Sequence, residues 1–201
     1  MMKDTYLTIQ EPAQGIYKEK GSKFMAFAYP AGSEDDIKAN LDILKRQYHD
    51  ARHHCYAWRL GAEMKRFRSN DDGEPSGSAG PPILGQIRSK DLTNILLVVV
   101  RYFGGTLLGV GGLIQAYKSA AADALEHATI VQEKVMSRWE LNFGYPQLNT
   151  VMKLVKEYNL NLDEQQFDLD CRMVLTIWKR NEKNLQQRVA MIEGCRITPA
   201  E

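Results

Sequence analysis

The sequence predicts an α+β protein made of two domains, and three observations support this. Thirteen of the fifteen glycines precede Val135, so the two halves of the chain differ in texture. After Lys134, hydrophobic residues alternate first with the period of a strand and then with that of a helix. The run 95–100 is apolar on both faces, which is typical of a strand covered on both sides. We therefore predict one domain at residues 1–133 and another at residues 134–201.

The first domain opens with extended segments at residues 5–17 and 23–29. A helix is expected to begin after Ser33, because Ser33 and Asp36 have the spacing of a capping box with Asp in the place of Glu or Gln. A strand is expected at residues 55–60. The buried stripe of this helix is expected to contain Ile37, Leu41, Leu44 and Tyr48.

The rest of the first domain is expected to hold a loop, a strand and a helix. Residues 69–82 are dense in Gly, Pro, Ser and Asp, so we expect an extended loop there. Residues 95–102 should form the central strand. A glycine-rich segment follows, and then a helix at residues 113–128. Its small residues let it approach the sheet closely: Ala116, Ala120, Ala121 and Ala124.

The second domain reads as alternating strands and helices. Pro146 suits the start of a helix, where a missing backbone N–H costs nothing. Asn181 is a suitable N-cap for a later helix, and Gly194 is a suitable stop. The expected elements are a strand at 135–145, a helix from Pro146, two strands within 160–177, a helix between Asn181 and Gly194, and a strand at 195–198. This order, βαββαβ, predicts a ferredoxin-like domain.

Composition excludes several classes of protein. No apolar run approaches the roughly 18–20 residues that span a bilayer, and residues 1–10 show no secretory signal, so we expect a cytoplasmic protein. The formal net charge is +1, so nucleic-acid binding would have to rest on a local patch. Cys55, Cys171 and Cys195 are far apart and form no C-x-x-C motif, so unpaired thiols are expected.

The loop carries three carboxylates within four residues: Asp71, Asp72 and Glu74. Oxygen ligands of this kind attract Mg²⁺, so a metal-assisted hydrolase is one alternative. The spacing is not that of an EF-hand, and no metal site is expected. Ser76 lies outside any G-x-S-x-G motif. Turn formation and partner binding are the other interpretations of this loop.

A glycine-rich segment joins the central strand to the next helix, from Arg101 to Gly112. Backbone N–H groups at residues 111–113 would point out of the helix N-terminus, where they can bind an anion. Val110 stands where a Walker A motif requires Lys, and the G-x-G-x-x-G spacing is absent. Tight turns and close helix packing are the structural alternative.

Basic and aromatic residues interleave around these segments, as suits RNA phosphates and unstacked bases. They are Arg52, His53, Arg59, Lys65, Arg66, Phe67, Arg68, Arg88, Lys90 and Arg101. A solvated surface is the alternative. Successive strand residues point to opposite faces, so His53 and His54 should not share a metal, and nothing orients a base toward Cys55.

Four segments together resemble the signature of the YigZ/IMPACT family, over about residues 15–128. They are Lys20–Phe24, Ala51–Arg59, Asp71–Gly80 and Val99–Tyr117. The resemblance implies an N-terminal domain like the second domain of ribosomal protein S5. It also implies a C-terminal ferredoxin-like domain like the last domain of the ribosomal translocase. Ser78 and Gln115 are mild departures from the family pattern.

Eukaryotic IMPACT regulates translation by competing for the activator of a starvation-responsive kinase, with an additional N-terminal domain. This sequence begins almost at the shared region, so that pathway is not expected here. We instead predict a translation-associated regulatory protein, a bacterial member of the family, that binds RNA, the ribosome or a translation factor. The alternatives are the hydrolase that uses Asp71–Glu74 and a regulator that binds protein alone.

Binding is expected more than catalysis, with no cofactor, no membrane partner and no sequence-specific DNA recognition. The acidic loop and the glycine segment should form a single exposed face. The candidate binding residues are His54, Tyr56, Arg59, Arg68, Asp71, Asp72, Glu74, Ser76, Arg101, Tyr102, Phe103, Gly104, Gly105, Gly111 and Gly112.

Overall fold

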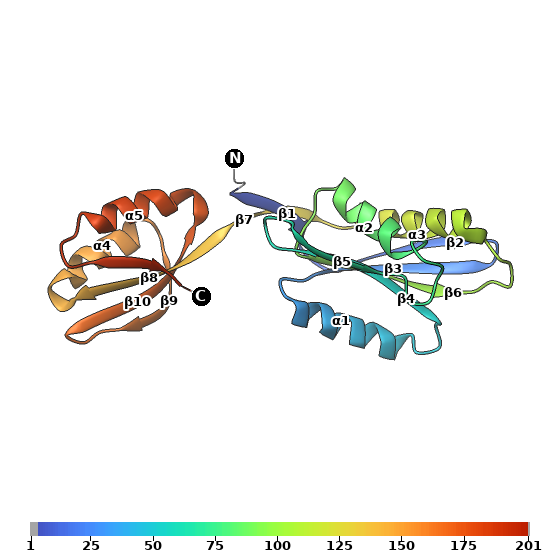
Figure 1. The fold of residues 1–201 in the computed structure, drawn as a ribbon, viewed down its shortest axis with the longest axis horizontal. Coiled ribbons are helices and arrows are strands. Elements are labelled where there is room, and N and C mark those ends of the chain that lie inside the picture. The colour runs from blue at the N-terminus through green and yellow to red at the C-terminus, as the bar shows by residue number, and fades with distance from the viewer. Residues whose placement is uncertain (1–3, 201) are drawn as a thin grey trace. The chain divides into compact units, whose positions relative to one another are not determined.

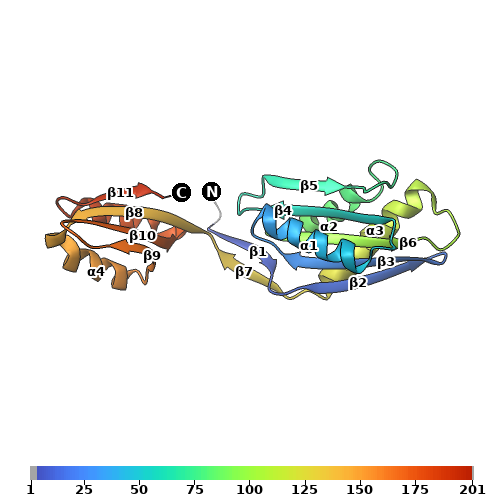
Figure 2. The same cartoon turned by 90° about the horizontal axis from the view of Figure 1, so that it is seen from below.

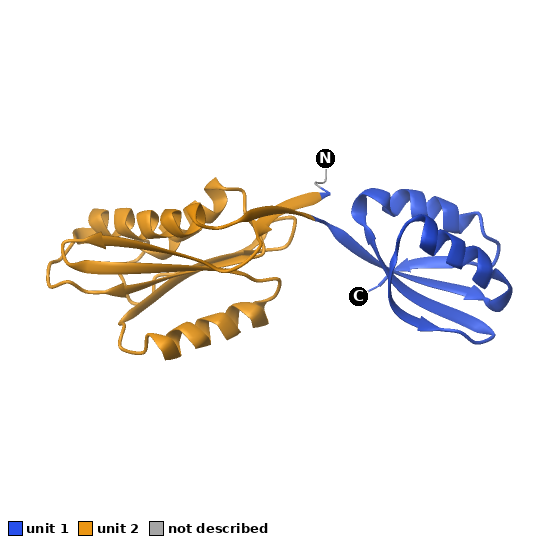
Figure 3. Ribbon diagram, turned by 180° about the vertical axis from the view of Figure 1, so that it is seen from behind, with its two compact units in different colours: residues 1–4, 134–201 blue, residues 5–133 orange. Residues whose placement is uncertain are grey.

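The structure is a computed structural model that describes residues 4–200. The chain divides into two compact units, one of residues 5–133 and one that combines residues 134–200 with Asp4 (Figure 3). Each contains both helices and strands (Figure 1). The chain is therefore a mixed α/β protein with two units.

The unit of residues 5–133 is built on a five-stranded antiparallel sheet with the order β2-β3-β6-β4-β5. Its strands are β2 (Ala13–Glu19), β3 (Ser22–Pro30), β4 (His53–Leu60), β5 (Arg66–Asn70) and β6 (Ile95–Tyr102). A separate two-stranded sheet pairs β1 (Thr5–Ile9) with β7 (Ile130–Lys134). The order of the larger sheet places β6 in its centre.

Helices cover both faces of this sheet. Helix α1 (Glu34–Gln47) lies on one face, and α2 (Gly80–Ser89) and α3 (Gly109–Glu126) lie on the other (Figures 1 and 2). Side chains of β6 enter both cores: Leu97 and Val99 pack with α2 and α3, whereas Val98 and Val100 pack with α1. This confirms the prediction of a central strand that is apolar on both sides.

Local signals located α1 and the strands on either side of it, but not α2. Ser33 accepts a hydrogen bond from the Asp36 N–H, and the Asp36 carboxylate accepts one from the Ser33 N–H, so the capping box is confirmed. The prediction of a loop over residues 69–82 is wrong at both ends, because β5 reaches Asn70 and α2 begins at Gly80. Helix α3 begins at Gly109 rather than at Leu113.

The second unit has the element order that its periodicity predicted. Its sheet has the order β11-β8-β10-β9 and is antiparallel throughout. The elements are β8 (Met136–Gly144), α4 (Leu148–Glu157), β9 (Asn161–Gln166), β10 (Asp170–Trp178), α5 (Glu182–Ala190) and β11 (Arg196–Pro199). Two cap details differ: the Asn181 side chain makes no capping bond, and α5 ends four residues before Gly194.

The two faces of the second sheet have different chemistry. Residues of β8 and β10 pack against α4 and α5 to form one core. Residues that alternate with these core positions form ion pairs: Arg172 with Glu140 at 2.7 Å and with Glu164 at 2.9 Å. Arg172 is therefore neutralised by neighbouring carboxylates. Within residues 4–200, no helix is both long and apolar enough to cross a bilayer.

Candidate functional site

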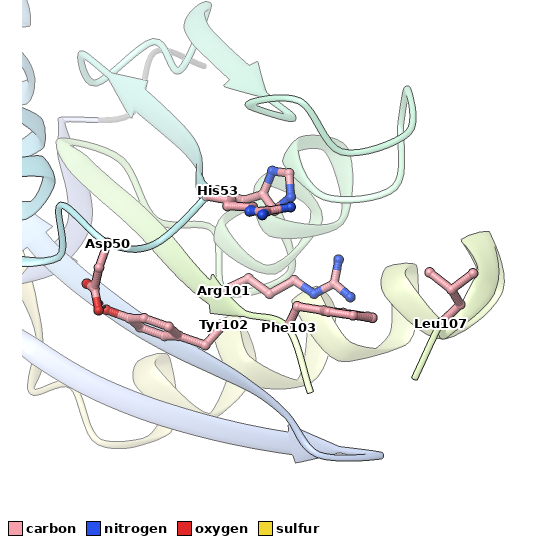
Figure 4. Close-up of a pocket in the computed structure, with 7 residues that line it drawn as sticks. Asp50, His53, Arg101, Tyr102, Phe103 and Leu107 are labelled. Carbon is pink, nitrogen blue, oxygen red and sulfur yellow. Dashed lines mark hydrogen bonds between the residues drawn. The ribbon is translucent and has the colours of Figure 1, made fainter. Parts of the chain in front are cut away.

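A pocket of about 660 Å³ lies in the unit of residues 5–133, where β4 begins and β6 ends (Figure 4). Register explains why distant residues meet there, since His53 pairs with Arg101 across the antiparallel β4–β6 ladder. The segment before β4 and the loop after β6 complete the lining. The lining residues are Asp50, Arg52, His53, Arg101, Tyr102, Phe103 and Leu107.

Arg101 lies at the centre of this site, and it is a buried charge. Its Nη1 donates to Glu74 Oε1 at 2.6 Å, and both side chains are more than nine-tenths buried. The guanidinium carbon lies 5.4 Å from the centre of the Phe24 ring and 5.7 Å from that of the Phe103 ring, and Figure 4 shows the guanidinium over Phe103. Arg101 Nε is buried and, among the described atoms, has no hydrogen-bond partner. One of its donors thus remains unsatisfied beside a pocket.

Glu74 is part of a buried network of polar side chains. Tyr117 Oη donates to the same Glu74 oxygen at 2.8 Å, and the Cys55 thiol lies 3.3 Å from Tyr117 Oη. Burial raises the pKa of Tyr117 and raises the pKa of the Cys55 thiol to about 12. Cys55 is therefore a neutral thiol at physiological pH, which does not suit a nucleophile.

The other carboxylates of the acidic loop (residues 71–79) hold the loop itself together. Asp71 accepts from the backbone N–H groups of Gly77, Ala79 and Gly80, at 2.8–2.9 Å. Burial opposes ionisation of Asp71, but these three donors outweigh it and the pKa of Asp71 is lowered. Asp72 accepts from the His54 N–H at 2.6 Å. Each carboxylate is thus taken up by protein donors, so the hydrolase alternative receives no support from the geometry.

The two histidines have different surroundings. His53 Nδ1 lies 2.9 Å from the Asp72 carbonyl oxygen, which can only accept, so Nδ1 carries the proton and Nε2 remains for a ligand. His54 is buried, and burial lowers its pKa despite Asp72 nearby. No group of three potential metal-ligating side chains occurs in residues 4–200. His53 therefore lines the pocket, whereas the His54 side chain is buried and does not line it.

The remaining lining residues give the pocket one polar end and one apolar end. Tyr102 Oη donates to Asp50 Oδ1 at 2.7 Å, which raises the pKa of Tyr102 to about 12 and lowers that of Asp50. Phe103 and Leu107 are 56% and 84% exposed, although both are large and hydrophobic. Figure 4 shows the Asp50–Tyr102 pair and Leu107 on opposite sides of Arg101.

The acidic loop and the glycine-rich segment lie together as predicted, but the contact between them is buried, and the wider set of candidate residues is dispersed. The buried contact is the ion pair between Glu74 and Arg101. Arg59 pairs with Ile95 at the far end of the ladder, about 20 Å from Arg101 at some 3.3 Å per residue. Arg59 is also largely buried and donates to the carbonyl oxygens of Met64 and Leu92.

Other predicted residues lie outside the pocket. Arg68 is exposed on β5, across from Trp58 and near the Arg59 end. Tyr56 packs against the core beneath α1, and Ser76 is exposed on the acidic loop. Of the fifteen predicted binding residues, Arg101, Tyr102 and Phe103 line the pocket.

The predicted glycines differ in how much room the structure leaves for a side chain at each position. A Cβ at Gly104 would lie 1.9 Å from the Gly21 carbonyl carbon, so Gly104 is needed for chain packing. Gly105 has a φ of +88°, which favours glycine. A Cβ at Gly112 would lie 3.0 Å from Leu108 Cβ. At Gly111 a Cβ would meet no described atom within 4 Å, so packing does not account for it.

Asp50 and Leu107 are pocket residues that the sequence reasoning missed. Asp50 is 52 residues from its partner Tyr102, and no local pattern connects them. The sequence did contain a signal for the ion pair between Arg101 and Glu74. Arg101 ends a run of six apolar residues, and a charge in a buried strand requires a buried counter-charge nearby.

The chain is similar to several known proteins. Residues 20–125 match the Impact N-terminal domain. IMPACT family member YigZ of Escherichia coli (strain K12) is 33% identical over 171 residues, which cover 83% of this chain and 84% of that protein. IMPACT family member YvyE of Bacillus subtilis (strain 168) is 32% identical over 163 residues, covering 81% of this chain and 75% of that protein. A crystal structure of a hypothetical protein has a TM-score of 0.80 at 27% identity, and the match covers 99% of this chain and 98% of that one.

Proposed function

This chain belongs to the IMPACT family, and we propose that it is a translation-associated regulatory protein that binds RNA, free or within the ribosome. The pocket at the β4–β6 end carries the proposal. It combines a buried arginine with an unsatisfied donor, an exposed arginine and an exposed aromatic ring: Arg101, Arg52 and Phe103. Arginine for phosphate and an aromatic ring for a base are the elements of single-strand recognition.

The translational part of this proposal is supported by the family resemblance, which implies that eukaryotic members regulate translation. We further propose that the protein works in the cytoplasm, where translation takes place.

We also propose that residues 1–133 and 134–201 are separate domains, like the second domain of ribosomal protein S5 and like ferredoxin respectively. Two compact units support the division. The element order βαββαβ, with two helices packed on one sheet, supports the ferredoxin-like assignment.

Fluorescence anisotropy with a labelled single-stranded RNA tests RNA binding. We expect affinity to fall steeply as salt rises from 50 to 200 mM, because phosphate contacts release counterions. Absence of binding at the lowest salt, with both single-stranded RNA and purified ribosomes, contradicts the proposal. Recovery of a translation factor that survives nuclease treatment, without RNA binding, would indicate a regulator that binds protein alone.

A further inference from the structure

The pocket has the size of a small-molecule site. Its volume of about 660 Å³ falls inside the range of roughly 300–1,000 Å³ that such sites occupy. Its walls come from the start of β4, the end of β6 and the segments next to them, and the register of the ladder fixes the two strand ends. The pocket is therefore part of the fold of the unit of residues 5–133.

One side of the pocket carries unsatisfied donors. Buried polar groups in native proteins nearly always have partners, so a buried Arg101 Nε without one calls for an explanation. Nη1 is the Arg101 atom that donates to Glu74, and Nη2 makes no hydrogen bond within the described part of the chain. Arg52, next to His53, is exposed and makes no ion pair with any residue in 4–200. Oxygens of an anionic ligand would satisfy these donors.

The other lining groups orient such a ligand. The Asp50 carboxylate would repel a phosphate, so the phosphate belongs near Arg101 and Arg52 rather than near Tyr102. Phe103 offers its ring beside the Arg101 guanidinium, and Leu107 leaves a largely bare apolar side chain nearby. A flat aromatic group placed against Phe103 would cover both. An anion alone would leave this apolar surface in water.

We propose that the pocket holds one ribonucleotide unit, with its phosphate at Arg52 and Arg101 and its base stacked on Phe103. This rests on the proposed RNA binding and specifies the part of the strand that the protein grips. The β4–β6 end is then a nucleotide subsite.

Titration of the labelled full-length protein with nucleoside 5′-monophosphates, followed by amide NMR, tests the subsite. We expect the signals of His53, Phe103 and Leu107 to shift. Phe103→Ala should weaken binding roughly fivefold or more, the effect of losing one base stack. Arg52→Gln should weaken it by a similar factor. Matched controls are Phe167→Ala and Arg196→Gln, exposed residues of the second unit, which should leave the affinity unchanged.

Three outcomes overturn the inference. If mononucleotides shift no pocket signal while an RNA oligonucleotide still binds, the subsite fails and the proposed function stands. If neither binds, both fail. If inorganic phosphate produces the same shifts and Phe103→Ala changes nothing, the pocket binds an anion and not a nucleotide.

Discussion

Arg101 and Glu74, 27 residues apart in the chain, form an ion pair of 2.6 Å in which the side chains are 7% and 3% exposed. The pair joins the acidic loop to the end of β6. It also explains how a charge can end an otherwise apolar central strand, since each charge supplies the other with a partner that water would otherwise provide. The wall of the pocket depends on this contact.

Glu74→Ala should lower the free energy of unfolding of the first unit by about 3–5 kcal/mol, because it leaves the Arg101 guanidinium buried without a counter-charge. Urea unfolding followed at NMR signals from residues 5–133 measures this without interference from the second unit. The double variant Glu74→Ala with Arg101→Met should cost less than the two single changes added together.

Glu34→Ala is the matched control, since Glu34 pairs with Arg66 at 2.7 Å but both side chains are 63% exposed. Its cost should stay within about 1 kcal/mol. Equal costs for Glu34→Ala and Glu74→Ala would contradict the claim that burial makes the second pair important.

Asp71→Asn should destabilise the protein at pH 7, because three backbone N–H groups lose an ionised acceptor. The pKa of Asp71 is lowered in the folded state, so its contribution is fully present above the unfolded-state pKa of about 3.9. The contribution is lost as the pH falls through the folded-state pKa. The difference in unfolding free energy between the two proteins should therefore shrink below about pH 4. A difference that stays constant from pH 7 to pH 3 would rule out this role for the carboxylate.

Gly104→Ala and Gly111→Ala should have opposite effects on stability. A side chain at Gly104 collides with the backbone of Gly21, so we expect strong destabilisation or failure to fold. Gly111 lies in the first turn of α3 with open space around it, so alanine there should stabilise by up to about 1 kcal/mol. Thermal unfolding of both variants measures this. Destabilisation by Gly111→Ala would show that packing requires this glycine.

Cys195 should react with a thiol reagent before the other two cysteines. Burial raises the pKa of both Cys195 and Cys55, but Cys195 is partly exposed, whereas Cys55 and Cys171 are buried and the pKa of Cys55 is raised to about 12. At pH 8 we expect one fast reacting thiol in the native protein, and the other two after unfolding. Cys195→Ser should remove the fast phase. Fast labelling of Cys55 in the native protein would contradict the buried chain from Cys55 to Glu74.

The sequence predicted those elements whose signals are local. The capping box at Ser33 and Asp36 lies within four residues, and the alternation in β8 and β10 lies within single strands. Helix α2 was missed because Pro81 and Pro82 resemble loop residues, although proline suits a first helical turn. The carboxylate that binds the N–H groups at its start, Asp71, lies nine residues before Gly80, beyond the range of capping patterns.

The site was predicted in part, for a similar reason. Arg101, Tyr102 and Phe103 could be predicted because they lie where an apolar strand ends at a glycine-rich turn. Which side chains face them depends on the register of β4 against β6, and this placed His53 there and Arg59 at the opposite end. Glu74 and Arg101 were predicted to be exposed but are buried. Their burial could not be predicted because the two charges meet and neutralise each other only in the folded chain.

Photocrosslinking tests the central claim of RNA binding at the pocket most directly. A single-stranded RNA carrying 4-thiouridine, irradiated with the full-length protein and analysed by mass spectrometry, should crosslink to the peptide that contains Tyr102 and Phe103. Excess unlabelled mononucleotide should reduce that crosslink. Crosslinks confined to residues 134–201, or no crosslink under conditions in which RNA is bound, would contradict the account.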